Sequence, residues 1–286
     1  MTTTTSTYLS IVNNLPKMQA MTAKDPAVQT ASAYYAANIG SVTSINDFVG
    51  NYRLLSYALN AFGLGDQINS TALIKQVLEG GVSNPKSLAN TLPQWRAFAT
   101  AFNFAANGAA SVSAPAAVAT IRSDYVEQQL ENNQGQQNVG VQLALYFNRV
   151  APTVTSEYGI LADPNLLNVV ETIFSLPSSL SSENIDVQAK TLSDVLPLSD
   201  LSNPKQLQQL TERFTAEYDA TYNSPGSTAT PLTVAGSSSS SSSSSGSAAL
   251  TILSGIISSN ASTSSAGGSL FSESLLQSLQ SFTLGG

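Results

Sequence analysis

An internal repeat limits the fold of this chain more than any other feature of its sequence. Residues 34–64 align without a gap on residues 146–176, an offset of 112, and eight of the 31 positions are identical. A further match, at an offset of 119, joins the Asn-Pro-Lys at 84–86 to that at 203–205. The matches fall mainly on apolar positions and helix starts, as two copies of one helical unit require. We therefore predict a duplicated helical module; the alternative is chance similarity between Ala- and Leu-rich helices.

Helix-start and helix-stop signals recur along the body of the chain. Ser44 to Asp47 forms a capping-box variant that opens a helix running to Phe62, and Gly63 stands where a left-handed C-cap belongs. Further starts are predicted at Asp25-Pro26, at Ser70 for a helix ending at Gly80-Gly81, and at Asn84-Pro85, Asp163-Pro164 and Asn203-Pro204. No pair of strands joined by a turn dipeptide is visible. We predict an all-α fold with two related multi-helix units in tandem.

The composition changes near Asn223 and divides the chain. Ser237 to Ser245 is a run of nine serines, and such a segment buries too little apolar surface to offset its chain entropy. The predicted divisions are helical repeat unit 1 over residues 6–104, helical repeat unit 2 over 116–222, a disordered Ser-rich linker over 223–247 and a C-terminal tail over 248–286. Residues 105–115 are the natural connector between the two units.

A short amphipathic helix is predicted within the C-terminal tail, over residues 269–282. An isolated helix of this length is marginal in water, so it folds only against the body of its own chain or against a partner, and otherwise stays disordered. The candidate partner-binding residues are its apolar side chains, Leu270, Phe271, Leu275, Leu276, Leu279 and Phe282.

The composition excludes most familiar active sites. The chain has no His and no Cys, which removes the Ser-His-Asp triad, thiolate nucleophiles, disulfides and the commonest zinc ligands. We therefore expect no catalytic residue, no cofactor and no metal site. The net charge of −7 repels phosphate backbones, so nucleic-acid binding is not expected. No stretch reaches the roughly 20 apolar residues of a spanning helix. The Thr- and Ser-rich N-terminus, expected to be disordered, lacks the pattern of a secretory signal.

Three segments carry a resemblance to a known family. They are G-Q-Q-N-V-G-V-Q-L-A-L-Y-F-N-R-V-A-P-T-V-T-S-E-Y-G-I-L-A-D at 135–163, Y-Y-A-A-N-I-G-S-V-T-S-I-N-D-F at 34–48 and L-S-Y-A-L-N-A-F-G-L at 55–64. The chain resembles domain-of-unknown-function family twelve-seventeen over residues 8–222. Its members are small helical proteins, mostly alphaproteobacterial and often encoded among flagellar genes, so the resemblance implies a helical fold and a flagellar setting but no activity. Gln142 departs from the family pattern, which usually carries Arg before L-A-L-Y-F, and this puts a salt bridge or anionic contact at that position in doubt.

Hydrolytic chemistry without His or Cys would need paired carboxylates. Glu157 with Asp163, and Glu127 with Glu131, are the locally paired candidates. We interpret Asp163 as an N-cap, and place Glu127 and Glu131 on a solvated helix face. Arg149 lies at a helix C-terminus, where a cation is favourable. From it we expect a buried salt bridge to a carboxylate such as Asp163, or a contact with a carboxylate of a partner.

Aromatic pairs recur at equivalent positions of the two copies, as Tyr34-Tyr35 and Tyr146-Phe147. Adjacent residues point to different faces of a helix, so one ring of each pair can enter the core while the other covers a neighbouring helix or anchors an interface. Core filling is the simpler interpretation. Trp95 is expected to pack between helices.

Two function hypotheses fit these observations. In the first, the chain is a non-enzymatic structural or interaction protein associated with the bacterial flagellum, exported through the flagellar secretion channel, and located in the flagellum or secreted. In the second, it is a cytoplasmic accessory protein, an export chaperone or regulator, that binds a flagellar client through helix-in-groove contacts. A carboxylate-dependent hydrolase is a remote third. The expected partner is a protein, either a flagellar component or the export machinery, and the sequence does not fix the oligomeric state.

Overall fold

The computed structural model describes residues 3–91, 93–224, 227, 229 and 232–235, all within one compact unit, Met1–Ser242. Over these residues the chain forms helices joined by short connections, with no strand, which confirms the predicted all-α class. None of the described helices combines the length and the hydrophobicity that a membrane crossing requires. The predicted tail, residues 248–286, lies outside the described residues.

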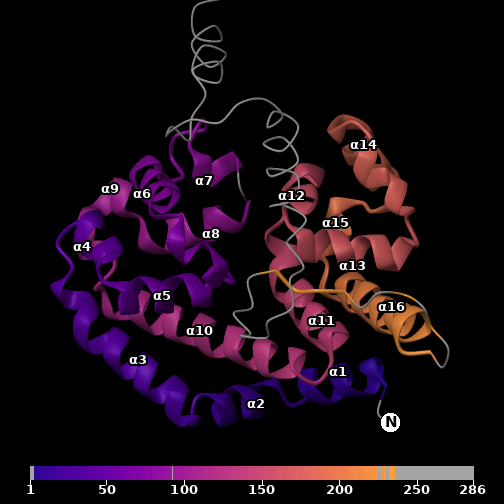
Figure 1. Cartoon of the computed structure of the whole chain (residues 1–286), viewed down its shortest axis with the longest axis horizontal. Helices are drawn as coiled ribbons and strands as arrows, with labels where there is room; N and C mark the ends of the chain where they lie inside the picture. Colours follow the sequence, from indigo (N-terminus) through magenta and orange to yellow (C-terminus); the bar gives the residue numbers. More distant parts are fainter. Residues whose placement is uncertain (1–2, 92, 225–226, 228, 230–231, 236–286) are drawn as a thin grey trace, which may run out of the picture. The chain divides into compact units, whose positions relative to one another are not determined.

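The helices follow one another along the chain as Figure 1 shows. The first copy contains α1 (Thr4–Val12), α2 (Leu15–Thr22), α3 (Pro26–Asn38), η1 (Ile39–Ser41), α4 (Ile45–Gly50), α5 (Tyr52–Ala61), η2 (Gly65–Asn69), α6 (Thr71–Gly80), α7 (Leu88–Thr91) and α8 (Pro93–Phe102). The connection to the second copy contains α9 (Phe104–Asn107) and η3 (Gly108–Ser111). The second copy contains α10 (Pro115–Gly135), α11 (Val139–Val150), η4 (Ala151–Thr153), α12 (Glu157–Ala162), α13 (Pro164–Phe174), η5 (Ser178–Ser182), α14 (Ile185–Val195), α15 (Leu198–Ser202) and α16 (Pro204–Tyr222).

The order of elements repeats along with the sequence. The offset of 112 relates the first residues of η1 and η4, of α4 and α12, and of α5 and α13, and it also relates the last residues of α3 and α11. In the first copy, α7 and α8 take the place of the single helix α16. Pro93 begins α8 and has no backbone N–H to donate to a preceding turn. The sequence repeat is thus a repeat of helices and their connections.

The C-termini of α5 and α13 end in the same motif. Gly63 has φ +70°, and Ser175, 112 residues later, has φ +49°, so both adopt the left-handed conformation. The next residue of each copy, Leu64 or Leu176, donates its N–H to the carbonyl five residues earlier, at 2.8 and 2.9 Å. These bonds satisfy carbonyls that a helix end otherwise leaves free. The left-handed cap predicted at Gly63 is confirmed.

Two of the predicted helices are wrong. The helix expected over residues 44–62 is instead α4 followed by α5, because Asn51 between them has an extended backbone and caps α5, its side-chain oxygen accepting the Leu54 N–H at 3.2 Å. The helix expected to start at Asn84-Pro85 does not form there. The Asn84 side chain accepts an N–H within a turn, and α7 begins three residues after the proline.

The first helix of each copy, α1 or α10, contributes side chains to the hydrophobic cluster of the other copy. α1 packs on α11 and α16, which puts Tyr8 and Ile11 in the cluster of the second copy. α10, which begins the second copy, packs on α5 as well as on α11 and contributes Ile121 and Tyr125 to the cluster of the first copy. The limits of the two cores therefore differ from the limits of the two sequence copies, and the exchange joins both copies into one unit.

The N-terminus is helical rather than disordered, so that prediction is wrong. Thr3 caps α1 by accepting the N–H of Ser6 at 3.1 Å. The Thr4 N–H donates to the Asp219 carboxylate at 2.8 Å, and its hydroxyl also bonds to this carboxylate. Tyr8 is 1% exposed. A Thr- and Ser-rich composition indicated disorder, but here these hydroxyl groups cap the helix and bind α16.

Candidate functional site

An ion pair between partly buried Arg149 and buried Glu131 holds α10 against α11. The Arg149 guanidinium donates to both carboxylate oxygens of Glu131, at 2.6 and 2.8 Å, and to the side-chain oxygen of Gln128 at 2.8 Å. Glu131 is 2% exposed, so its predicted place on a solvated face is wrong, because α10 packs along α11 and turns this face inward. The buried salt bridge expected of Arg149 is present, but its acid is Glu131 and not Asp163.

Asp163 is the N-cap of α13, as predicted. One of its oxygens accepts the N–H groups of Asn165 and Leu166, and the other accepts the Tyr146 hydroxyl at 2.6 Å. Burial raises the pKa of Asp163, while the Tyr146 hydroxyl and the two N–H groups lower it by a smaller amount. Both oxygens are engaged within the fold, so Asp163 is not free to act with Glu157 as a hydrolytic pair.

Two further acids lie along the same helix, α10. Burial raises the pKa of Asp124 and of Glu127, and the nearby Arg149 guanidinium opposes this effect at both. Raised carboxyl pKa values are typical of active sites when the acids share a cleft. None of the hollows described next is lined by two carboxylates, however. Neither Asp124 nor Glu127 lines any of these three hollows.

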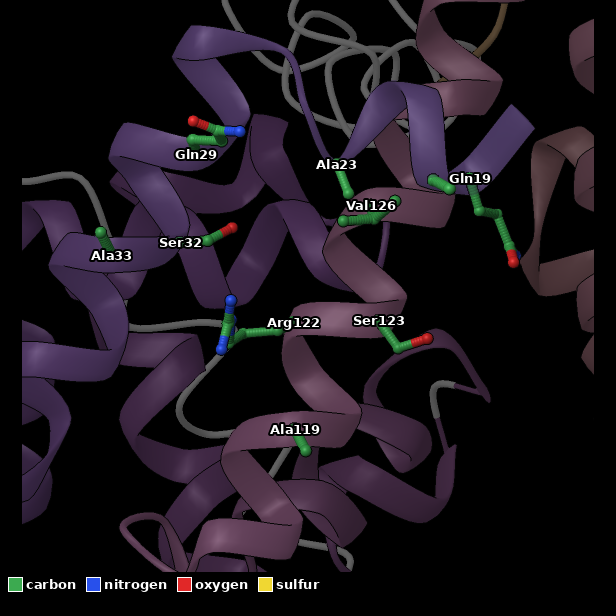
Figure 2. Close-up of a pocket in the computed structure, with 10 residues that line it drawn as sticks. Gln19, Ala23, Gln29, Ser32, Ala33, Ala119, Arg122, Ser123 and Val126 are labelled. Atoms are coloured by element: carbon green, nitrogen blue, oxygen red, sulfur yellow. The ribbon is translucent and has the colours of Figure 1, made fainter. Parts of the chain in front are cut away.

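One hollow, of about 670 Å³, opens between α2, α3 and α10. Figure 2 shows the side chains of Ser32, from α3, and Arg122, from α10, extending into the space between their helices. Its lining residues are Gln19, Ala20, Ala23, Gln29, Ser32, Ala33, Ala119, Arg122, Ser123 and Val126. This set offers one cation, several small polar groups and no acid, so it lacks the groups for acid–base catalysis. A second hollow, about 330 Å³, is lined partly by Met18 and Met21.

A smaller hollow of about 170 Å³ lies between α3, α5 and α10 and is rich in aromatic side chains. We define Tyr34, Tyr52, Arg53, Tyr57 and Tyr125, which line it, as the tyrosine–arginine site. The rings of Tyr57 and Tyr125 stack with 3.9 Å between centroids, and the Arg53 guanidinium lies 3.7 Å from the centroid of Tyr34. Tyr52 is 66% exposed. The site is therefore an open aromatic surface with a cation at its edge.

The core supports this surface from behind. Tyr35, which is fully buried, stacks on Tyr57 with 4.5 Å between ring centroids, so three tyrosine rings stand in one stack. The Tyr57 hydroxyl, beside the small hollow, lies 2.9 Å from the hydroxyl of Ser32, which lines the 670 Å³ hollow. Burial raises the pKa of Tyr57 to about 12, so its hydroxyl stays protonated at neutral pH. The buried Tyr35 ring thus supports the Tyr57 ring from behind, and tyrosine side chains lose little conformational entropy on binding.

The comparisons with known proteins place the chain in a family. The family model described as protein of unknown function (DUF1217) matches residues 61–207. The chain belongs to the DUF1217 family. A crystal structure of a protein from Agrobacterium tumefaciens, named only by its gene locus, is 36% identical to this DUF1217 protein, with a TM-score of 0.70; the alignment covers 77% of this chain and 94% of that one. No curated protein matches. The predicted family resemblance is confirmed. Neither the family description nor the description of the Agrobacterium protein states an activity.

The other residues singled out from the sequence of this DUF1217 protein are the two aromatic pairs, Trp95 and the apolar side chains of the tail. Tyr35 and Phe147 are buried in the two cores, as core filling predicts, whereas Tyr34 borders the tyrosine–arginine site. Trp95 is buried and packs edge-on against Phe98, as expected of a residue between helices. The candidate partner-binding residues of the tail lie outside the described residues; they are Leu270, Phe271, Leu275, Leu276, Leu279 and Phe282.

The sequence contained only part of the signal for the tyrosine–arginine site. Tyr52 and Arg53 directly follow the N-cap Asn51, and a helix start commonly exposes its first side chains. Tyr125 belongs to the other copy and reaches the site only because α10 packs on α5. No local pattern predicts that contact.

Proposed function

We propose that this protein is a non-enzymatic interaction protein associated with the bacterial flagellum, which it reaches through the flagellar secretion channel. The tyrosine–arginine site carries the interaction role. Tyrosine and arginine are enriched among the residues that dominate binding at protein interfaces. Here Tyr52 is exposed, and Arg53 forms no ion pair with any residue that the structure describes. A cation held on a tyrosine ring and left without an acid is suited to a carboxylate of a partner.

The flagellar setting is supported by the family resemblance, because members of this family are often encoded among flagellar genes. The proposed route through the flagellar secretion channel rests on the same resemblance. A disordered N-terminus no longer supports it, because α1 contributes Tyr8 to a core. Removing the first ten residues would therefore disturb folding as well as export, so that deletion is not a clean test.

Fractionation of the full-length protein tests the proposal. The bacterium that encodes it would carry a C-terminal epitope tag on the chain, and the tag would be measured in cytoplasm, sheared filaments and medium. We expect the protein in the filament or medium fraction, and we expect it to return to the cytoplasm when flagellar export is blocked. A cytoplasmic marker controls for lysis. Retention in the cytoplasm of exporting cells would contradict export and favour the alternative, an accessory chaperone or regulator.

The interaction role has its own test. Tyr52→Ala combined with Arg53→Gln removes exposed groups and leaves the core intact, so we expect little change in the free energy of unfolding, within about 1 kcal/mol. The same variant should reduce swimming of the cells that carry it. Arg96→Gln is the matched control, because Arg96 is also an exposed arginine of a first-copy helix, α8. Normal swimming by the double variant would remove the support for this site.

A further inference from the structure

The second copy shows what covers the position that corresponds to Arg53. Asn165 follows Arg53 by 112 residues, and each is the second residue of its helix, α13 or α5. The Asn165 side chain donates to the Ala235 carbonyl at 3.0 Å and accepts the Ala235 N–H at 2.9 Å. Asn165 is 4% exposed. In the second copy, therefore, this position binds the backbone of a later segment of the same chain.

The bound segment, residues 232–235, has a simple pattern. It forms no helix, and Leu232 and Val234 are partly buried against the second cluster while Thr233 between them is exposed. Alternation with a period of two is the pattern of an extended chain. This part of the predicted Ser-rich linker is thus packed, and it binds through its backbone and two alternating apolar side chains.

Among the residues that the structure describes, no segment covers the corresponding surface of the first copy. Arg53 forms no ion pair or hydrogen bond with another residue within the described ranges, and its guanidinium lies over the Tyr34 ring, 3.7 Å from the centroid, beside the 170 Å³ hollow. A guanidinium has donors only, arranged as a planar fork that fits a carboxylate. The first copy has this guanidinium where the second copy has the Asn165 amide. Its preferred ligand is therefore a carboxylate rather than a peptide group.

The distribution of charge agrees with this preference. Residues 6–104 contain six Lys and Arg and four Asp and Glu, whereas residues 116–222 contain five and thirteen. The helix α10 lines the site and adds one basic and three acidic residues to the first core, which then has seven of each, while the rest of the second copy keeps four and ten. An acidic segment is thus repelled by the second core and not by the first.

We propose that the tyrosine–arginine site binds an extended segment of a partner protein, with an apolar side chain in the hollow and a carboxylate on Arg53. This inference rests on the proposed interaction role and specifies its ligand. The segment lies against Tyr52 and Tyr34 as residues 232–235 lie against the second copy. The segment ends at this point and presents its terminal carboxylate where the Ala235 carbonyl lies in the second copy.

Two fluorescent peptides test the inference by anisotropy with the full-length protein. Both have the sequence Thr-Pro-Leu-Thr-Val-Ala of residues 230–235, one with a free terminal carboxylate and one with a terminal amide. We expect the carboxylate form to bind at least tenfold more tightly. Arg53→Gln should remove this discrimination, and Tyr52→Ala should weaken both forms. Arg96→Gln should change neither, and helical circular dichroism checks that every variant is folded.

Three results would overturn the inference: equal binding of the two peptides, discrimination retained in Arg53→Gln, or no binding of either peptide at millimolar concentration. Tighter binding by a peptide forced into a helix with α-aminoisobutyric acid would also overturn it, because the proposed ligand is extended. None of these results bears on flagellar association, which fractionation measures separately. Conversely, if the protein stays in the cytoplasm but still binds the carboxylate peptide more tightly than the amide, the proposed ligand is supported and the flagellar association is contradicted.

Discussion

The two copies hold the same tyrosine against the same helix cap, yet one pair is open and the other closed. The Tyr34 hydroxyl lies 3.5 Å from the side-chain oxygen of Asn51, the cap of α5, and the pair is partly exposed. The Tyr146 hydroxyl lies 2.6 Å from Asp163, the cap of α13, and that pair is buried. A shared frame of helix, turn and cap therefore supports two environments. Which one results depends on the capping residue and on what packs over it.

The position of the arginine differs in the same way. Arg53 lies over the ring of Tyr34 at 3.7 Å, and Arg149 lies over the ring of Tyr146 at 5.4 Å. The first comes from the start of α5 and the second from the end of α11, and the residue that corresponds to Arg149 in the first copy is Ala37. Arg149 has Glu131 as its acid, whereas Arg53 has none within the described ranges. One copy uses the cation to hold its own helices together, and the other keeps it at the surface.

The largest predicted effect concerns Arg149. Arg149→Leu leaves the Glu131 carboxylate buried without a partner, so we expect the free energy of unfolding in urea to fall by about 3–5 kcal/mol. Arg53→Leu removes only an exposed contact with a ring and should cost under about 1 kcal/mol. The double variant Arg149→Leu with Glu131→Leu should recover much of the loss, because it removes both charges. Equal losses for Arg149→Leu and Arg53→Leu would mean that the two copies do not differ in this way.

The second effect concerns the caps. Asp163→Ala removes the bonds to Asn165 and Leu166 and leaves the Tyr146 hydroxyl buried without its acceptor, so we expect a loss of about 2–3 kcal/mol. Asn51→Ala removes a cap at a partly exposed site and should cost about 1 kcal/mol. Urea titration of both variants gives the ratio, and a larger loss at Asn51 would reverse the comparison.

The third effect concerns the segment that covers the second copy. Asn165→Ala removes two hydrogen bonds to Ala235 and should lower the free energy of unfolding by about 1–2 kcal/mol. In a chain truncated after Ser224 the same substitution should cost much less, because its partner is already gone. The measurement compares the loss of unfolding free energy in the truncated variant with the sum of the losses caused by the substitution and the truncation alone, and we expect the losses not to add. Additive losses would show that Asn165 stabilises the fold by some other contact.

The local features of this fold follow from the sequence more readily than the long-range ones. The proline-led caps at Asp25, Asp163 and Asn203 and the glycine stop at Gly63 are predictable because each depends on hydrogen bonds to residues two to five positions away. The same local pattern was misleading at Asn84, because an Asn-Pro pair caps a turn as well as a helix.

The candidate site depends on contacts that no local pattern contains. Glu131 pairs with Arg149 because α10 lies along α11, and Tyr125 joins the tyrosine–arginine site because the same helix also lies on α5. α10 has apolar and charged residues on several faces, since it contacts both copies, so its pattern does not show which acids are buried. Tyr8 is similar, because its burial depends on α11 and α16, more than a hundred residues away.

A smaller effect, in its dependence on pH, tests the burial of Asp163. Burial raises its pKa in the folded protein, so its contribution to stability is present at low pH and is lost as pH rises through that pKa. Asp163→Asn gives the second copy the cap of the first and removes this titration. The free energy of unfolding of the variant relative to the parent should therefore rise between pH 3 and pH 7, measured by urea titration at each pH. A difference that falls over this range would show that the carboxylate form is the one favoured by the fold.

The smallest predicted effect compares the two left-handed caps. Ser175 has φ +49°, which L residues rarely adopt, so Ser175→Gly should raise the free energy of unfolding by about 0.5–1 kcal/mol. Gly63→Ser makes the reverse change in the first copy. There a new Cβ would lie 3.2 Å from the Gln128 side-chain oxygen, which also binds Arg149. We therefore expect Gly63→Ser to cost more than Ser175→Gly gains, by thermal or urea unfolding. Equal and opposite changes would mean that the cap of the first copy carries only backbone strain and that its contact with the ion pair of the second copy contributes nothing.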